Sequence, residues 1–266
     1  MEQPLAYIHP DAKIGKDVVI GPFVTIDKNV VIGDGTRIEP NVTIYEGARI
    51  GKNCRIFPGA VIAAVPQDLK FRGEETTVEI GDNNMIRECV TIHRGTASKG
   101  KTVIGNNCLI MAYAHIAHDC VLGSNIILAN AVQLAGEVEV DDFAIIGGGT
   151  LVHQFSRIGG HVMIQGGSHI NKDIPPYVRA ARMPISYTGI NTVGLRRRNF
   201  SNETIALIQD VYRSLFASGM NTTEALAYIE SEIPASKERD EIVAFVRASS
   251  RGIIKGLTGG ASVVND

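Results

Sequence analysis

Residues 8–62 read IHPDAKIGKDVVIGPFVTIDKNVVIGDGTRIEPNVTIYEGARIGKNCRIFPGAVI, with isoleucine at every sixth position from Ile8 to Ile62. The spacing continues to Ile170, and 25 of the 28 sixth positions from Ile8 to Ile170 are Ile, Leu or Val. A helix of about 3.6 residues per turn cannot hold a six-residue stripe on one face, so this period excludes α-helix. A hexapeptide period of this length is typical of a parallel β-helix, in which each repeat adds one short strand to a shared core.

The repeat fails at three positions, Asp68, Glu74 and Ser98. They fall inside two segments, near residues 63–79 and 94–103, that contain glycine and several charged residues. Because the phase resumes after each segment, we expect two loops that leave and re-enter one face of the column. Loops on a rigid scaffold often carry binding and catalytic residues.

The chain divides into a repeat region and a helical region. We expect the β-helix to span residues 1–185, and the apolar spacing over residues 186–256 predicts a C-terminal helical domain. The small and polar tail, residues 257–266, is expected to be disordered. The predicted helix-capping residues are Ser201, Thr222 or Thr223, and Ser236.

The composition excludes several classes of protein. The 26 Lys and Arg residues nearly balance the 28 Asp and Glu residues, so nothing points to nucleic acid or an anionic membrane. Cys54, Cys108 and Cys120 occupy a slot otherwise filled by small residues, which predicts buried fillers and no disulfides. No export signal or membrane-spanning apolar run is visible, so we expect a cytoplasmic protein.

Histidines gather in the segment AHIAHDC, residues 114–120. Ile116 holds the inward position, so His115 and His118 are expected to lie toward the outer surface. A single surface histidine is usually only solvated, but two histidines beside an aspartate and near two loops favour a functional site. Asp119 is a candidate to orient the His118 imidazole, although neighbours on a strand usually face opposite ways.

Stacking extends this site. If three hexapeptides close one coil, residues 18 apart lie above one another, so Gly136 lies over His118 and Gln154 lies one coil further. A glycine leaves its N–H accessible, which suits an oxyanion donor beside a histidine general base. No serine or cysteine nucleophile stands beside the pair, which favours direct attack by a bound hydroxyl.

A zinc site is an alternative, since histidines between subunits bind zinc in one branch of the β-helix proteins. Catalytic zinc takes about three protein ligands and keeps one open position. His115 and His118 are three residues apart, and no third histidine falls close in the coil map. We therefore expect no metal.

Several longer segments carry a resemblance to one family. They are VPQDLK (65–70), VTIHRG (90–95), AHIAHD (114–119), DFAIIG (142–147), VHQF (152–155) and GLRRR (194–198). Over essentially its whole length the chain resembles the acyl-[acyl-carrier-protein]–UDP-N-acetylglucosamine O-acyltransferases, which open lipid A synthesis. The resemblance implies a left-handed β-helix, a homotrimer with sites between neighbouring columns, acyl carrier protein as the 3-hydroxyacyl donor, UDP-N-acetylglucosamine as the acceptor, and no cofactor.

The resemblance also implies roles for single residues. It makes His118 the general base and Gly136 the oxyanion donor. The matched substrate-binding positions are Asp68 and Lys70 for the sugar nucleotide and acyl chain, His93 near the phosphopantetheine arm, His115, His153 and Gln154 along the cleft, and Asn191, Arg197 and Arg198 for the nucleotide. Gly166 matches a position near the end of the acyl channel, and its small size predicts a long acyl chain.

Two positions depart from the family pattern, and one run of residues has other interpretations. Glu137 stands where relatives often carry His, and Val193 where some carry an acidic residue, so contacts there do not transfer. A paired fork of Arg197 and Arg198 suits a diphosphate. Two other interpretations of the arginines at 196–198 are possible. They form an ordinary solvent-exposed basic run, or they form a patch that attracts the acidic carrier protein.

Three other functions fit the sequence less well. The related N-acyltransferase of the same pathway carries an extra domain before its repeats, whereas here Ile8 already begins the repeat. An acetyl-CoA-dependent hexapeptide transferase does not account for the helical region. A non-catalytic scaffold has no reason to break its core phase at Asp68 and Glu74 beside a histidine cluster.

Overall fold

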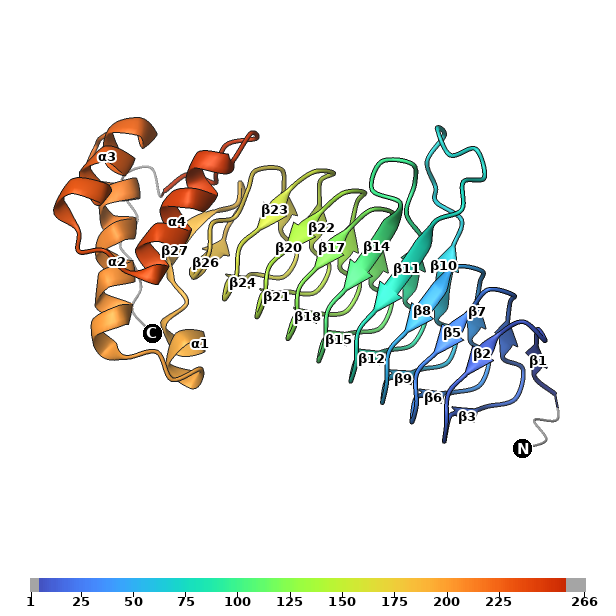
Figure 1. Ribbon diagram of the computed structural model, residues 1–266. Helices are drawn as coiled ribbons and strands as arrows, with labels where there is room; N and C mark the ends of the chain where they lie inside the picture. Colours follow the sequence, from blue (N-terminus) through green and yellow to red (C-terminus); the bar gives the residue numbers. More distant parts are fainter. Residues whose placement is uncertain (1–4, 257–266) are drawn as a thin grey trace.

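The computed structural model describes residues 5–256, which form a long column of short strands followed by four helices (Figure 1). Three parallel sheets make the walls of the column, and we call them walls A, B and C. The predicted fold class, a left-handed parallel β-helix with a C-terminal helical domain, is confirmed.

The strands succeed one another around the three walls. Wall A holds β1 (Tyr7–Ile8), β4 (Thr25–Ile26), β7 (Thr43–Ile44), β10 (Val61–Ala64), β13 (Thr91–His93), β16 (His115–Ile116), β19 (Gln133–Leu134), β22 (Leu151–Val152) and β25 (His169–Ile170). Wall B holds β2 (Lys13–Ile14), β5 (Val31–Ile32), β8 (Ala48–Ile50), β11 (Thr77–Ile80), β14 (Lys101–Ile104), β17 (Val121–Leu122), β20 (Glu139–Val140) and β23 (Arg157–Ile158). Wall C holds β3 (Val19–Ile20), β6 (Arg37–Ile38), β9 (Arg55–Ile56), β12 (Met85–Ile86), β15 (Leu109–Ile110), β18 (Ile127–Leu128), β21 (Ile145–Ile146), β24 (Met163–Ile164), β26 (Val178–Ala181) and β27 (Ser186–Ile190).

The sixth-position aliphatic residues form the core. Most strands have two residues, of which the first faces outward and the second is buried, as with Thr25 and Ile26. Ile26 pairs with Ile44, 18 residues later, so identical side chains stack along the column. Many corners place Asn or Asp in the left-handed backbone region, for example Asn29 and Asn53, which these residues tolerate better than most. This repetition builds a rigid scaffold.

Two loops interrupt the column at the same corner. Val61 pairs with Thr91 and Thr91 with His115, separations of 30 and 24 residues in place of 18. The extra residues are whole numbers of hexapeptides, which is why the phase survives both loops. Each loop joins wall A to wall B, from β10 to β11 and from β13 to β14, and both project from the column on one side (Figure 1).

The C-terminal helices are α1 (Thr192–Arg197), α2 (Asn202–Ala217), α3 (Thr222–Glu232) and α4 (Lys237–Ala248). Ser201 and Ser236 cap α2 and α4 as predicted. The prediction of a threonine cap for α3 is wrong, because Asn221 accepts the Glu224 N–H and the Glu224 carboxylate accepts the Asn221 N–H. This capping box satisfies two backbone donors at once.

The sequence missed the short elements that join the two regions. Helix α1 and the antiparallel pair β26–β27 are too short for a periodic pattern to reveal them. Cys54, Cys108 and Cys120 are buried fillers as predicted, while Cys89 is exposed, and all four are free thiols. The expected disordered tail, 257–266, lies outside the described residues. None of the described helices is long and apolar enough to cross a membrane.

Candidate active site

The corner between walls A and B, which we call the A–B edge, brings the predicted catalytic residues together. His118 follows β16, Gly136 follows β19 and Gln154 follows β22, and these strands pair in an 18-residue register. The Glu137 N–H donates to the His118 carbonyl at 3.0 Å, and the Phe155 N–H donates to the Gly136 carbonyl at 3.2 Å. The stacking predicted from the sequence is therefore confirmed.

Gly136 lies directly against the His118 imidazole. A Cβ at residue 136 would stand 2.6 Å from Cε1 and 2.7 Å from Nε2 of His118. Within residues 5–256, no acceptor takes the Gly136 amide hydrogen. The glycine thus makes room for the ring and leaves an unused N–H beside it.

Asp119 holds the other side of the ring. The His118 Nδ1 lies 2.8 Å from Oδ2 of Asp119, whose side chain is fully buried. Because an ionised carboxylate only accepts hydrogen bonds, Nδ1 carries the proton and Nε2 is free to take one. Asp119 adopts a left-handed backbone, with φ of 61°, in the corner and outside any strand. The rule that strand neighbours face opposite ways therefore does not apply.

Hydrogen bonds keep Asp119 ionised. Burial alone would raise the pKa of Asp119, but hydrogen bonds from Thr96, His118 and Lys99 outweigh it and hold the pKa below its ordinary value. The Thr96 hydroxyl donates to Oδ2 at 2.7 Å, and the Thr96 and Lys99 amides donate to Oδ1 at 3.0 and 3.2 Å. A fixed anion beside Nδ1 suits a histidine base.

His93 and His115 extend the cluster. Their rings meet edge to face with centroids 4.7 Å apart, and the Thr91 hydroxyl lies 2.7 Å from Nδ1 of His115. Burial lowers the pKa of His93 to about 4, helped by the neighbouring His115 and His118. Burial also lowers the pKa of His115, again with help from His118. Both rings are therefore neutral near pH 7.

Two expectations about the histidines are wrong. The coil map placed no third histidine nearby, but the second loop lengthens that coil to 24 residues and so sets His93 beside His115. His118 was expected on the outer surface, yet it is only 8% exposed because residues 94–100 fold against Asp119. Across the described part of the chain, no three metal-ligating side chains are grouped to hold an ion.

His153 and Gln154 continue the A–B edge toward the helices. The His153 Nδ1 lies 2.9 Å from the Gln154 carbonyl and 3.2 Å from Nη2 of Arg251. Arg251 belongs to the segment after α4. This segment returns to the column, where Ile253 forms an isolated β-bridge with Asp173. No sequence pattern predicts this contact, because the two residues are 98 positions apart.

The first loop carries Asp68 and Lys70. Oδ1 of Asp68 accepts the Lys70 N–H at 2.9 Å, and the Lys70 side chain is exposed. Among residues 5–256, no hydrogen bond links either side chain to the histidine cluster. Within one chain, the described contacts of these two residues are therefore local to the first loop.

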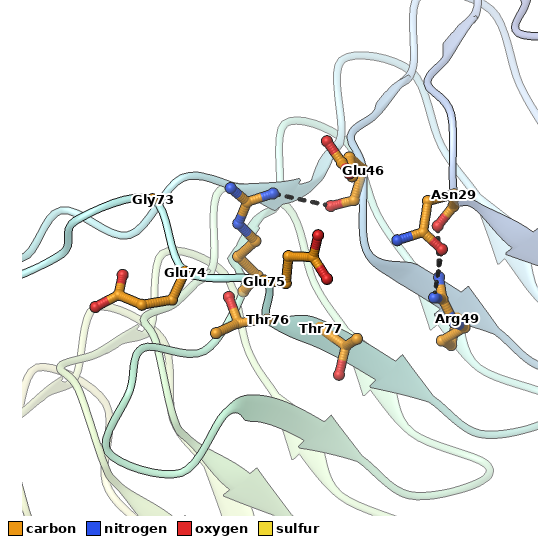
Figure 2. Close-up of a pocket in the computed structure, with 9 residues that line it drawn as sticks. Asn29, Glu46, Arg49, Gly73, Glu74, Glu75, Thr76 and Thr77 are labelled. Carbon is orange, nitrogen blue, oxygen red and sulfur yellow. Dashed lines mark hydrogen bonds between the residues drawn. The ribbon is translucent and has the colours of Figure 1, made fainter.

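A polar pocket of about 380 Å³ lies at the foot of the first loop (Figure 2). Glu74, one of the broken repeat positions, and Glu75 line one side of it, with Glu46 and Arg49 across from them. Arg94, the residue after His93, also lines the pocket and donates to the Glu46 carbonyl at 3.2 Å. The pocket thus continues the A–B edge on the N-terminal side of the histidines.

The predicted nucleotide residues lie elsewhere, on wall C. Asn191, Val193 and Arg197 line a second pocket, of about 500 Å³, together with Met163 and Arg179. Oδ1 of Asn191 caps α1 at the Gly194 N–H and its Nδ2 donates to the His161 carbonyl at 2.8 Å, so this side chain is already paired. In one chain these residues do not meet His118.

Arg197 and Arg198, the residues of the predicted arginine fork, make different contacts in the single chain. Arg197 is exposed and lines the wall C pocket. The Arg198 guanidinium instead lies 5.2 Å from the centre of the Phe143 ring and donates to the Phe143 carbonyl at 3.1 Å. Arg198 is the C-cap residue of α1, and the paired fork stays a prediction.

Gly166 lies at the corner between walls C and A. A Cβ there would stand 2.9 Å from the Gly148 carbonyl oxygen, tighter than ordinary contact. The close packing of adjacent coils is therefore one reason for glycine at this position.

Comparison with known proteins identifies the family. A curated acyl-[acyl-carrier-protein]–UDP-N-acetylglucosamine O-acyltransferase from Thermodesulfovibrio yellowstonii is 47% identical over 251 residues, which are 94% of this chain and 97% of that protein. The chain belongs to the UDP-N-acetylglucosamine O-acyltransferase family. The family model described as "Udp N-acetylglucosamine O-acyltransferase; Domain 2" matches residues 173–254, and the model "Bacterial transferase hexapeptide (six repeats)" matches residues 101–136.

Solved structures of UDP-N-acetylglucosamine acyltransferases share the fold of this family member. The protein from Bacteroides fragilis is 59% identical with a TM-score of 0.95, covering 96% of this chain and 100% of that one. The protein from Francisella novicida is 44% identical with a TM-score of 0.93, covering 96% and 94% of the two chains. The chain is accordingly an acyltransferase.

Some residues of this O-acyltransferase site escaped prediction from the sequence. Thr91 and Thr96 contact His115 and Asp119 across coils of irregular length. The broken repeat at Ser98 marked the loop that carries Thr96, but it did not show which side chain turns inward. Arg251 left no signal, because only the return of the chain after α4 brings it to His153.

Proposed function

We propose that the enzyme transfers a 3-hydroxyacyl group from acyl carrier protein to the 3-hydroxyl of UDP-N-acetylglucosamine, the first step of lipid A biosynthesis. The observation that carries this proposal is the His118 ring, bonded through Nδ1 to buried Asp119 and lying against the Gly136 amide. One group can accept a proton and the other can stabilise an oxyanion, as acyl transfer requires. We also propose that the enzyme acts in the cytoplasm, where a donor carried on a free carrier protein would reach it.

The reaction follows from this geometry. His118 Nε2 takes the proton of the sugar hydroxyl while its oxygen attacks the thioester carbon. The carbonyl electrons move to the oxygen, and the Gly136 N–H donates to that oxyanion. Collapse of the tetrahedral intermediate breaks the carbon–sulfur bond, and the imidazolium returns its proton to the departing thiolate.

Direct transfer is favoured over an acyl-enzyme. Cys120, the nearest cysteine in sequence to the histidines, is fully buried, and burial raises its pKa to about 12. A thiol in that state is a poor nucleophile, since thiolates react and thiols do not.

The two groups of site residues support a shared site in a homotrimer. His118, Gly136 and Gln154 lie on the A–B edge, whereas Asn191 and Arg197 lie on wall C. Columns packed side by side would set the A–B edge of one copy against wall C of the next. Asp68 and Lys70 would then reach the cleft from the first loop.

We assign the remaining residues by their places along this cleft. Near the donor arm we place His93 and His115, and beside the acceptor His153 and Gln154. Exposed Arg197 holds the diphosphate, while Asn191 holds the start of α1 and so positions Arg197. Arg198 supports the same helix from Phe143. At the end of the acyl channel, Gly166 leaves room for a long chain.

The test is a product analysis. Purified protein is incubated with UDP-N-acetylglucosamine and mixed 3-hydroxyacyl carrier proteins, and the sugar nucleotides are identified by mass spectrometry. We expect a single 3-O-acyl product whose chain is longer than ten carbons. His118→Ala should abolish transfer while the protein stays folded. Transfer only to a 3-amino sugar, only from acetyl-CoA, or at normal rate in His118→Ala would overturn the proposal.

A further inference from the structure

The second loop, residues 94–100, is a tight loop beside the histidines that backbone hydrogen bonds close. The Gly100 N–H donates to the Thr96 carbonyl at 2.8 Å, and the Gly95 N–H donates to the Thr77 carbonyl at 3.2 Å. A Cβ at residue 95 would stand 2.2 Å from the Lys101 backbone nitrogen, so the loop has room only for glycine at this position. The loop therefore presents Thr96 in a fixed place.

Thr96 supplies half of the hydrogen bonds to the Asp119 carboxylate. Oδ1 accepts the Thr96 and Lys99 amides, and Oδ2 accepts the Thr96 hydroxyl at 2.7 Å and His118 Nδ1 at 2.8 Å. Thr96 is 6% exposed and Asp119 is fully buried, so water does not compete for these bonds. The hydroxyl and the imidazole share one carboxylate oxygen.

The direction of the Thr96 hydroxyl is fixed. Its oxygen accepts the Ser98 N–H at 3.2 Å, which leaves its one proton for Asp119. The backbone of Asp119 is held as well, since its N–H donates to the Thr102 hydroxyl at 2.8 Å. The Thr96 hydroxyl therefore acts as a donor to Asp119, and the Asp119 backbone is held in place beside it.

We propose that Thr96 is a positioning residue for the transfer reaction, acting through Asp119 to set the orientation and basicity of His118. A donor on Oδ2 draws charge from the carboxylate and so weakens its pull on the Nδ1 proton. Without it, Oδ2 keeps more of its negative charge and attracts the Nδ1 proton more strongly. This inference rests on the proposed function, because it takes His118 as the base.

The test compares Thr96→Val with Thr96→Ser. Thr96→Val keeps the shape and the backbone donors but loses the hydroxyl, so kcat should fall roughly tenfold, the loss expected when one hydrogen bond to a charged group disappears. The KM values of both substrates should stay within about twofold. The acid limb of kcat/KM should move to higher pH. Thr96→Ser restores the donor and should restore both the rate and the pH profile.

Thr36→Val is the matched control for a purely structural effect. The Thr36 hydroxyl is also buried, donates to the Gly51 carbonyl at 2.8 Å and accepts the Cys54 N–H at 3.1 Å, far from the histidines. It should lower stability without moving kcat or the pH profile. Equal losses in Thr36→Val and Thr96→Val, or an unchanged pH profile in Thr96→Val, would overturn the proposal for Thr96.

Failure of the proposed function can be told apart from failure of this inference. A wild-type protein without transfer activity would refute the proposed function and leave Thr96 to be judged by ring-nitrogen NMR. The His118 signals, assigned by their loss in His118→Ala, should then move in Thr96→Val and stay in place in Thr36→Val. Unmoved signals in Thr96→Val would refute the positioning role.

Discussion

At the scale of residues, the site depends on one close contact and one buried ion. Gly136 touches the His118 ring on one side, and Asp119 binds its Nδ1 on the other. The ring is therefore held between a backbone contact and a hydrogen bond. Because the ring is already oriented, little further rotational entropy is lost when the proton is transferred.

Replacing Gly136 by alanine should displace the imidazole. The added Cβ would stand 2.6 Å from His118 Cε1, while the backbone at 136 is not left-handed and accepts alanine without strain. We expect kcat to fall roughly a hundredfold, as for small misplacements of reacting groups. The thermal midpoint should change by only a few degrees, which differential scanning calorimetry can check. A normal kcat would mean that the contact is unimportant.

A second residue-scale prediction concerns His161, which stacks between Phe143 and Tyr177 with centroids 4.8 and 5.5 Å away. Burial, with the charge of Arg198, lowers the pKa of His161 from 6.5 to about 4. The unfolded chain therefore binds a proton that the folded chain refuses between these values. The stability that the neutral ring provides is complete above about pH 6.5 and is lost as the pH falls toward 4.

His161→Phe should reduce this loss. Phenylalanine keeps the stack and cannot be protonated, so the urea midpoint should fall less between pH 7 and pH 5 than in the wild type. At pH 8, where the histidine is neutral, the two proteins should unfold at similar urea concentrations, which serves as the control. If the urea midpoints of the two proteins fell equally between pH 7 and pH 5, at a fixed protein concentration, His161 would not contribute to the acid sensitivity.

At the scale of elements, the loops are insertions that the column tolerates. The first loop adds twelve residues to its coil and the second adds six, as the 30- and 24-residue registers require. Insertions that are whole numbers of hexapeptides, like these two, keep the six-residue spacing of the later core residues. The sequence repeat therefore limits how loops can vary.

Removal of residues 65–76 tests this rule. The deletion joins β10 to β11 and restores Ile62 and Ile80 to a six-residue spacing. We expect unchanged circular dichroism and oligomer mass, with transfer lost because Asp68 and Lys70 are gone. The matched control removes residues 65–75 and leaves one extra residue at this corner, so it should unfold at a lower temperature than the twelve-residue deletion. Equal behaviour of the two deletions would refute the rule.

At the scale of the whole molecule, one chain holds two halves of the proposed cleft on different walls. His118, the proposed general base, lies on the A–B edge, and Arg197 lies on wall C. Because a rigid column cannot bend to bring them together, a second copy supplies the missing half in the site that we propose. This requirement links catalysis to assembly.

Subunit mixing tests the shared site. His118→Ala and Arg197→Ala should each be inactive or weak alone, but trimers refolded from an equal mixture should recover roughly a quarter of wild-type activity, because that share of sites takes both intact halves. His118→Ala mixed with Asp119→Ala is the control and should stay inactive, since both changes lie on one edge. No recovery in the first mixture would place the complete site within one chain.

The sequence by itself determined the β-helix, its inward residues and the stacking of Gly136 over His118. A six-residue period repeats one local geometry, so each coil follows from the last, and residues 18 apart must stack. The helix caps at Ser201 and Ser236 were equally local.

Only the tertiary structure decided which residues meet across irregular coils. The longer coils set His93 beside His115 and Thr96 on Asp119, and the returning chain brings Arg251 to His153. Such contacts depend on how loops close and on chain segments far apart in the sequence, and no periodic pattern encodes either. The regular repeat stacked His118, Gly136 and Gln154, and the irregular loops added the contacts that no periodic pattern encodes.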